Sequence, residues 1–250
     1  MADFLFKKSY QLKSFKSIVY DDLLGKRGIF TTIRVLGKKP KYILLLDHIK
    51  NMNSSLKVSN IHFLLSEKKL LKLIEPLLKQ KKTYDHLLRI AVNSKIISLS
   101  LRPRPKLHKN FNAILTSYQR PNPSFKNLHY KKITKLLNSI NIQKQEIILS
   151  GKGLLLEGCT TNILCIRNKI IFIPLRNYYQ GITMNYILSK TRRKINKIDI
   201  SIKSLHKFDE ILLVGSGKTV INLSSIPQIN WKPKSDLIYK ELLISYKKLL

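Results

Sequence analysis

Apolar positions in this chain recur with the spacing of strands in some segments and with the spacing of helices in others. Residues 28–35 are rich in β-branched and aromatic side chains, which is typical of a strand. A turn at residues 37–40 predicts that residues 41–45 pair back on this strand as a hairpin. Asp47 is then expected to be the N-cap of a helix that continues through Met52.

The next segments continue this alternation of helix and strand. Ser66 is expected to cap a second helix, in which Leu70, Leu73 and Ile74 recur at helical spacing. Residues 87–101 contain two apolar runs separated by Asn93 and Ser94, which predicts a second hairpin.

Prolines mark a boundary near the middle of the chain. Pro103, Pro105, Pro121 and Pro123, four of the nine prolines, lie within residues 102–124. One strand, residues 113–118, is expected inside this segment. The pattern predicts two domains, residues 1–108 and 109–250.

The second half repeats the mixture of strands and helices. The expected elements are an amphipathic helix at 130–140, hairpins turning at 151–153 and 167–169, a helix after Gly181, a strand at 210–214 and a last helix near Leu250. Strands and helices interleave in both halves, so the expected fold class is α/β (α+β), with two domains and a cleft between them.

Composition narrows the classes of function. The 250 residues carry 47 Lys and Arg against 14 Asp and Glu, a formal net charge of +33. The basic residues are spread along the chain, and Lys, Asn and Ile are abundant together, as A/T-biased coding would produce. Nucleic acid is therefore not the expected partner, although a basic nucleic-acid-binding protein stays an alternative. The charge should still attract anionic small molecules.

The sequence gives little support for a membrane protein or a metal-binding protein. No apolar run approaches the roughly 20 residues of a membrane-spanning helix, and residues 1–8 lack the apolar middle of a secretory signal. We expect a soluble, cytoplasmic protein. Cys159 and Cys165 form no CxxC pair, and the six histidines have no ligand spacing, so no metal site is expected.

Three further motifs carry candidate chemistry. Lys126 lies in Lys126-Asn127-Leu128-His129-Tyr130 and is followed by Glu157-Gly158, with Asn162 and apolar residues after it. The run of apolar residues before Glu157 places this acid at the end of a buried strand, where it needs a cationic partner. Residues 180–185 read as a helix start that could present amides to an anion.

A fourth motif, residues 213–219, looks like a nucleotide-binding P-loop. The first glycine of that motif would stand at Leu212, so the nucleotide interpretation is rejected. Its small residues, Ser216 and Gly217, could still let backbone amides surround an anion.

In this order the four motifs resemble those of the class IV aminotransferases, also called fold type IV enzymes. The resemblance extends from about Leu24 to Ile226 and implies two α/β domains with pyridoxal 5'-phosphate between them, usually in a homodimer. It implies that Lys126 forms the Schiff base with the cofactor and that Tyr130 contacts the cofactor ring or its phenolic oxygen. It also implies that Glu157 holds the pyridine nitrogen protonated. The expected phosphate-binding residues are Gly181, Ile182, Thr183, Ser216 and Gly217.

The chain departs from the family pattern at three positions. Asn51 stands where the family has an arginine that grips the cofactor phosphate, Met184 where it usually has an arginine, and His129 where it has an asparagine. A catalytically degenerate member of the family is therefore one alternative.

The resemblance implies an enzyme, and the expected reaction is the release of pyruvate from 4-amino-4-deoxychorismate, which leaves 4-aminobenzoate for folate biosynthesis. The short chain and the Lys-x-Leu-x-Tyr spacing at Lys126 resemble the lyase and D-amino-acid types more than the branched-chain type. An aminotransferase acting on D- or branched-chain amino acids is the alternative. Arg34, Arg102 and Arg104 are candidates for binding the carboxylate of the substrate.

Overall fold

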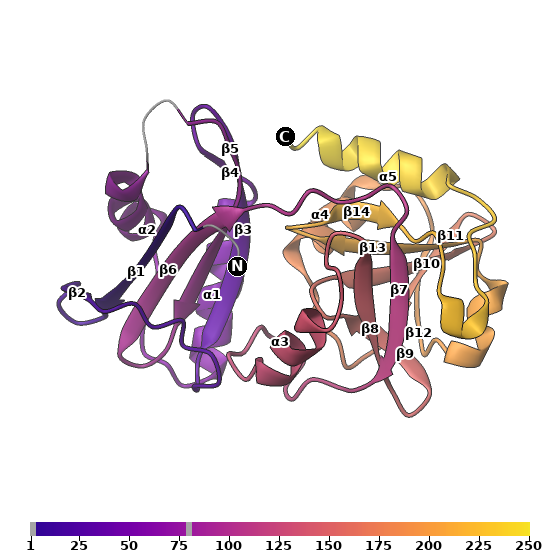
Figure 1. Cartoon of the computed structure of the whole chain (residues 1–250), viewed down its shortest axis with the longest axis horizontal. Helices are drawn as coiled ribbons and strands as arrows, with labels where there is room; N and C mark the ends of the chain where they lie inside the picture. Colours follow the sequence, from indigo (N-terminus) through magenta and orange to yellow (C-terminus); the bar gives the residue numbers. More distant parts are fainter. Residues whose placement is uncertain (1–3, 79–81) are drawn as a thin grey trace. The chain divides into compact units, whose positions relative to one another are not determined.

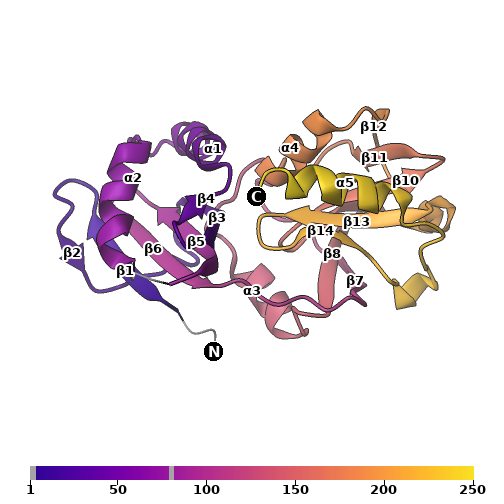
Figure 2. The ribbon, with the colours of Figure 1, turned by 90° about the horizontal axis from the view of Figure 1, so that it is seen from above.

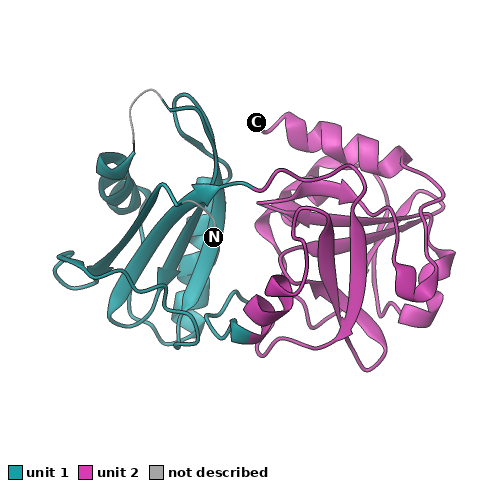
Figure 3. Ribbon diagram, viewed as in Figure 1, with its two compact units in different colours: residues 1–104, 125–131 teal, residues 105–124, 132–250 magenta. Residues whose placement is uncertain are grey.

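The computed structural model describes residues 4–78 and 82–250. These residues form two compact units (Figure 3): unit 1 consists of residues 1–104 and 125–131, and unit 2 of residues 105–124 and 132–250. The segment that contains Lys126 therefore belongs to unit 1. The domain division predicted at residues 108 and 109 stays a prediction, because compactness in one structure does not establish that a segment folds alone.

Unit 1 is built on an antiparallel sheet of six strands in the order β2-β1-β6-β5-β3-β4 (Figure 1). The strands are β1 (Phe6–Gln11), β2 (Ser17–Ile18), β3 (Ile29–Gly37), β4 (Lys41–Tyr42), β5 (Tyr84–Val92) and β6 (Ile96–Pro103). The predicted strand at 28–35 and the hairpin at Asn93 and Ser94 are confirmed. Strand β4 has only two of the five residues predicted for it.

One face of this sheet packs against helices α1 (Leu45–Val58) and α2 (Glu67–Ile74), which lie on the same side of it in Figure 2. A short 3-10 helix, η1 (Glu75–Leu77), follows α2. The predicted cap of α2 is confirmed, since the Ser66 side chain accepts a hydrogen bond from the Lys69 amide. The predicted cap of α1 is wrong. Leu44, in the left-handed conformation, precedes α1, and Asp47 lies in its first turn, where a carboxylate favours the positive end of the helix dipole.

Unit 2 contains two sheets. The larger has the order β12-β11-β10-β13-β14 and the smaller the order β7-β8-β9. The strands are β7 (Asn112–Ser117), β8 (Gln145–Gly151), β9 (Leu154–Gly158), β10 (Asn162–Arg167), β11 (Ile170–Pro174), β12 (Ile195–Ile198), β13 (Glu210–Gly215) and β14 (Thr219–Asn222). The strand predicted at 113–118, both predicted hairpins and the strand at 210–214 are confirmed.

Apolar layers lie on both faces of the larger sheet of unit 2. Helices α4 (Ile182–Lys190) and α5 (Leu237–Lys247) cover one face through residues such as Met184 and Leu242 (Figure 2). The other face packs against the smaller sheet around Phe111 and Trp231. The remaining helical segments of unit 2 are α3 (Lys131–Asn138), η2 (Ile202–Lys207) and η3 (Pro227–Ile229).

Both cysteines are buried in unit 2 as free thiols. Cys165 lies on β10, and Cys159 follows the end of β9. Burial raises the pKa of both thiols well above the ordinary range, and Glu146 and Glu157 raise that of Cys159 further. Both are therefore weak nucleophiles in the folded chain.

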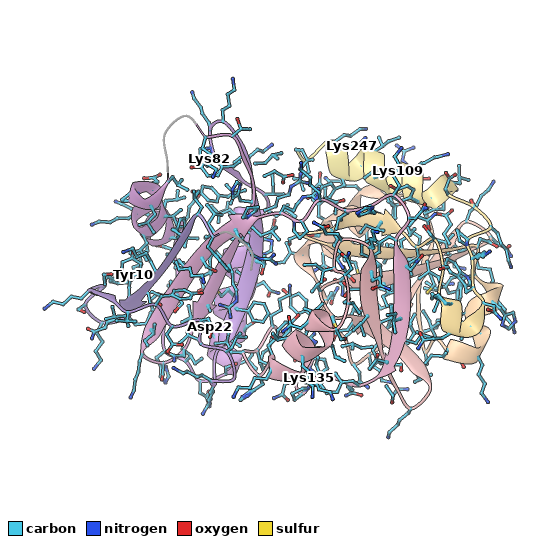
Figure 4. All side chains as sticks on the ribbon, in the orientation of Figure 1. Tyr10, Asp22, Lys82, Lys109, Lys135 and Lys247 are labelled. Atoms are coloured by element: carbon cyan, nitrogen blue, oxygen red, sulfur yellow. The ribbon has the colours of Figure 1, made fainter. Side chains whose placement is uncertain are left out.

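The positive charge is distributed over many elements. Figure 4 shows long side chains extending from every part of the ribbon, among them Lys109, Lys135 and Lys247, which are all exposed. Within the part of the chain that the structure describes, no helix is long and apolar enough to cross a membrane.

Candidate active site

The buried carboxylate of Glu157 lies at the end of β9, as its apolar neighbours predicted, and is 3% exposed. Its partner is Arg120. Arg120 Nε donates to Oε1 at 2.7 Å and Nη2 to Oε2 at 2.8 Å, so the pairing is bidentate. The Tyr179 amide donates a third hydrogen bond, to Oε2, at 3.1 Å. The three donors, two of them from one guanidinium group, satisfy the hydrogen bonding of a carboxylate that water does not reach.

Asn162 connects this carboxylate to the start of α4. Its side-chain amide donates to the Tyr179 carbonyl, and its Oδ1 accepts from the Gly181 amide at 3.1 Å. A Cβ atom at residue 181 would lie 2.2 Å from Asn162 Oδ1, so a larger residue here would displace the Asn162 side chain from this position. Asn162 therefore fixes the chain between Tyr179, which donates to Glu157, and the first turn of α4.

The first turn of α4 and the loop between β13 and β14 lie next to each other. Thr183 Oγ1 and Ser216 Oγ are 3.3 Å apart, and Thr183 is buried. Gly181 is the N-cap of α4, and among the residues that the structure describes no side chain makes a capping hydrogen bond to this helix. Ile182 is buried beside it, and Gly217 is half-buried in the loop. Two hydroxyl groups and the positive end of a helix dipole are thus brought together, as an anion site requires.

Lys218, which follows these loop residues, is directed to a different group. Its Nζ donates to Glu146 Oε2 at 2.9 Å, and Glu146 is fully buried. Thr160 Oγ1 donates to the same oxygen at 2.6 Å, and Thr161 Oγ1 at 3.3 Å. In a P-loop the lysine reaches the phosphates, whereas this lysine ties the loop after β13 to strand β8.

Lys126 lies in unit 1, in an extended segment that runs beside β3. The Lys126 carbonyl accepts from the Phe30 amide at 2.8 Å, and Asn127 forms a bridge with Ile29. Lys126 Nζ lies 5.7 Å from the centre of the Phe30 ring. The Tyr130 ring meets the same Phe30 ring edge-on, with 5.1 Å between centroids. Of the residues predicted from the sequence, Lys126 and Tyr130 thus share one aromatic neighbour.

His48, on α1, is a residue near Lys126 that the sequence reasoning did not single out. It is 4% exposed, and its Nδ1 lies 2.7 Å from Thr31 Oγ1. Burial, with a smaller contribution from the positive charge of Lys126, lowers the pKa of His48 to about 3. Asn51, one turn further along α1, is half-buried.

The three arginines expected to bind the substrate differ in their contacts. Arg34 donates to Asp85 at 3.0 Å, and Arg104 donates to the same carboxylate oxygen at 3.3 Å. Arg102 is half-buried, and burial lowers its pKa. A fourth arginine on the same sheet, Arg89, was not predicted; its guanidinium lies 5.2 Å from the centre of the Phe30 ring.

Sequence reasoning missed the partners of the predicted residues more often than the residues themselves. Arg120 stands in the proline-containing segment, and no local pattern distinguishes it from the other basic residues. The requirement that a buried Glu157 have a cationic partner was the only signal that such a residue must exist.

Comparison with known proteins relates this chain to a protein family. The family model described as amino-transferase class IV matches residues 28–226 of this chain. No curated protein matches this chain.

Several solved structures are similar along almost the whole chain. A Legionella pneumophila protein assigned provisionally as 4-amino-4-deoxychorismate lyase has 17% identity and a TM-score of 0.73, over 89% of this chain and 91% of that one. A branched-chain aminotransferase from Thermoproteus uzoniensis has 16% identity and a TM-score of 0.79, over 96% and 93%. The Escherichia coli branched-chain amino acid aminotransferase has 16% identity and a TM-score of 0.77, over 100% and 94%. At these identities the likeness shows that the fold is shared.

Proposed function

Since the chain belongs to the class IV aminotransferases, enzymes that use pyridoxal 5'-phosphate, we propose that it is the lyase that converts 4-amino-4-deoxychorismate to 4-aminobenzoate and pyruvate. When bound, this cofactor withdraws electrons from the bonds at the substrate Cα.

The observation that carries the proposal is the hydrogen bonding of Glu157. Of its two oxygens, Oε2 accepts two of the hydrogen bonds described above and Oε1 accepts one. A carboxylate oxygen can accept two, so with respect to the described residues Oε1 keeps one acceptor position. That position suits the N–H of a protonated pyridine ring, and the two hydrogen bonds from Arg120 fix the orientation of the carboxylate that would accept it.

The phosphate would be held by the start of α4 and the loop after β13. Thr183 and Ser216 supply hydroxyl donors, while the uncapped amides of α4 supply the helix dipole. Gly181, Ile182 and Gly217 contribute backbone at the same place. Asn51 cannot supply the charge of the arginine that the family has at its position, so this phosphate contact depends more on Thr183 and Ser216.

Lys126 is the proposed catalytic residue in unit 1. Its Nζ would hold the cofactor covalently, and the free amine would take the proton from the substrate Cα as general base. The same atom can return a proton as pyruvate leaves. His48 stays neutral beside it and therefore adds no second positive charge. Tyr130, which packs edge-on against Phe30, would contact the cofactor ring or its phenolic oxygen.

The choice of lyase over aminotransferase rests on the spacing at Lys126 and on the similar Legionella pneumophila structure. An aminotransferase is the second candidate, because the branched-chain aminotransferase structures match with somewhat higher TM-scores. We expect a cytoplasmic homodimer in either case.

Two measurements test the proposal. The protein is incubated with pyridoxal phosphate and reduced with borohydride, and the masses of its peptides are measured by mass spectrometry. The mass added by the cofactor should lie on Lys126 and be absent from the Lys126→Ala variant. Lys135→Ala, which removes an exposed lysine, is the matched control and should keep the added mass. Pyruvate release from 4-amino-4-deoxychorismate is then followed without any keto acid. A requirement for a keto acid would mean that the protein is an aminotransferase and not a lyase. If no mass were added to Lys126, the proposal that this chain is a pyridoxal-phosphate enzyme would be overturned.

A further inference from the structure

The connection from β11 to α4 is held by side chains of β9 and β10. Its residues, 175–181, lie outside the helices and strands of the described structure, and residues 175–177 are exposed. Tyr179 is buried, and both of its main-chain polar groups are bonded to side chains. Its amide donates to Glu157, and its carbonyl accepts from Asn162. The position of this connection therefore depends on these two side chains.

Asn162 stands where three parts of the candidate site meet. It is the first residue of β10, and its partner in the sheet is Val214 of β13, two residues before Ser216. Leu164 of β10 belongs to the core beneath α4 and α5. Because side chains alternate along a strand, Asn162 points to the same face. There its Oδ1 accepts from the Gly181 amide at 3.1 Å, just before α4 begins.

The hydrogen bond between Asn162 and Gly181 is closely fitted. Asn162 is 5% exposed, and a Cβ atom on residue 181 would lie 2.2 Å from its Oδ1. Loss of this contact would leave a buried amide without its partner, which is unfavourable. Movement of the Asn162 side chain therefore displaces Tyr179 and the first turn of α4 together.

These contacts connect the two ends of the proposed cofactor site. Glu157 would receive the ring N–H at one end, and Thr183 and Ser216 would receive the phosphate at the other. A connection outside helices and strands loses conformational freedom when a ligand fixes it. A second ligand that needs the same conformation then binds without that loss, so each ligand strengthens the binding of the other.

We propose that Asn162 is a positioning residue that couples these two ends, so that an anion bound at the start of α4 strengthens the binding of a pyridine ring at Glu157. This inference rests on the proposed cofactor site and deepens it, and it applies to a lyase and to an aminotransferase alike. Its consequence is cooperativity between the two ends, which is separate from the affinity of either end alone.

The test divides the cofactor into two fragments. Pyridoxamine carries the ring without the phosphate, and its amine forms no Schiff base with Lys126; inorganic phosphate occupies the other end. Equilibrium dialysis measures pyridoxamine binding to the cofactor-free protein with phosphate or with chloride at the same ionic strength. Phosphate should strengthen this binding by about twofold or more, the effect of groups that share one hydrogen-bond network. Pyridoxamine should strengthen phosphate binding by the same factor.

Two variants remove the same hydrogen bond from its two sides. Asn162→Ser shortens the acceptor side chain, whereas Gly181→Ala keeps Asn162 and places a Cβ atom against its Oδ1. Gly181 has a φ of −74°, which alanine adopts without strain. The enhancement by phosphate should disappear in both variants. Asn185→Ser is the control and should keep it, because Asn185 is exposed and lies two residues beyond the buried Thr183, on the opposite side of α4.

The enhancement distinguishes coupling from a structural role. A purely structural effect would lower the urea midpoint, followed by Trp231 fluorescence, and would weaken pyridoxamine binding equally with phosphate and with chloride. The enhancement would then persist and the coupling would be overturned. Persistence in both variants with normal stability would mean direct attraction between phosphate and ring, and would overturn it as well. Loss in only one of the two variants, or an equal loss in Asn185→Ser, would show that the Asn162–Gly181 hydrogen bond is not the link.

The wild type separates this inference from the proposed function. Mass added to Lys126 by the cofactor, together with pyridoxamine binding that phosphate does not strengthen, would overturn the coupling and leave the enzyme in place. Absence of both the added mass and any pyridoxamine binding would overturn the proposed function and the coupling together.

Discussion

Arg120 holds both carboxylate oxygens of Glu157 in a bidentate ion pair across 37 residues of sequence. The two side chains are only 6% and 4% exposed, so each neutralises a charge that water does not reach. The pair joins the segment before Lys126 to the end of β9 and fixes the orientation of the acid on which the proposed function depends.

Replacement of Arg120 by methionine should therefore destabilise unit 2 strongly. Glu157 would keep a buried charge with only the Tyr179 amide as donor, and the loss of one partner of a buried pair typically costs about 3–5 kcal/mol. Trp231, the only tryptophan, is buried in unit 2, so its fluorescence during urea unfolding reports this unit.

Two further variants test the cause of that loss. Arg120→Met with Glu157→Leu should be more stable than Arg120→Met alone, because the unpaired charge is gone. Arg176→Met breaks the exposed pair with Asp199 and should leave the urea midpoint unchanged. A double variant as unstable as Arg120→Met would show that packing, rather than charge, is what Arg120 contributes.

His48 should make the stability of unit 1 depend on pH in acid. Its pKa is about 3 in the folded chain against an ordinary value of 6.5, so between these values the unfolded chain binds a proton that the folded chain does not. The free energy of unfolding therefore falls as the pH drops from 6.5 toward 3, with a slope approaching about 1.4 kcal/mol per pH unit. Circular dichroism of urea unfolding at a series of pH values should show a flatter dependence for His48→Gln. Titration of the His48 ring in NMR spectra above pH 5 would contradict this expectation.

The hydroxyl groups of Thr183 and Ser216 should each contribute to cofactor affinity. Thr183→Val and Ser216→Ala should weaken pyridoxal phosphate binding by about tenfold each, the effect of one hydrogen bond to a charged group. Because these groups lie 3.3 Å apart, the double variant should lose less than the product of the two factors. Equilibrium dialysis measures the affinities. Ser189→Ala, on the exposed side of α4, is the control, and an equal loss in it would argue against a phosphate site.

Lys218→Met should act on folding rather than on the anion. It would leave the fully buried Glu146 with hydroxyl and amide donors alone, at a cost of about 3–5 kcal/mol. Trp231 fluorescence should show this loss, and Glu146→Gln in the same chain should recover part of it. A variant with normal stability and weakened cofactor binding would instead mean that Lys218 reaches the phosphate.

The positions predicted best from the sequence are those that local pattern determines. The apolar run before Glu157 predicts the end of a strand, and the Ser66 hydroxyl can accept a hydrogen bond from an amide in the first turn of a helix. The positions of Glu157 and Ser66 were therefore predicted correctly. Asp47 has the same capping chemistry as Ser66, yet the chain enters α1 through Leu44 in a left-handed turn that no residue preference predicts. Arg120 and Lys218 find their acids through the tertiary fold, which no window of sequence contains.

Sheet register explains the remaining difference for the arginines. Arg34 and Arg102 were among the arginines expected to bind the substrate carboxylate, whereas Arg89 lies inside an apolar run and was not predicted. Only the pairing of β5 with β3 and β6 places the three on one face.

The two buried thiols make unit 2 readable by covalent labelling. Cys159 and Cys165 react with a disulfide reagent only when the backbone around them opens, because the reactive thiolate is suppressed in the closed state. Cys165 lies on β10, the central strand of its sheet, while Cys159 lies just beyond β9, next to Thr160 of the Glu146 network. The two labelling rates would therefore distinguish the opening of the whole sheet from the opening of one loop.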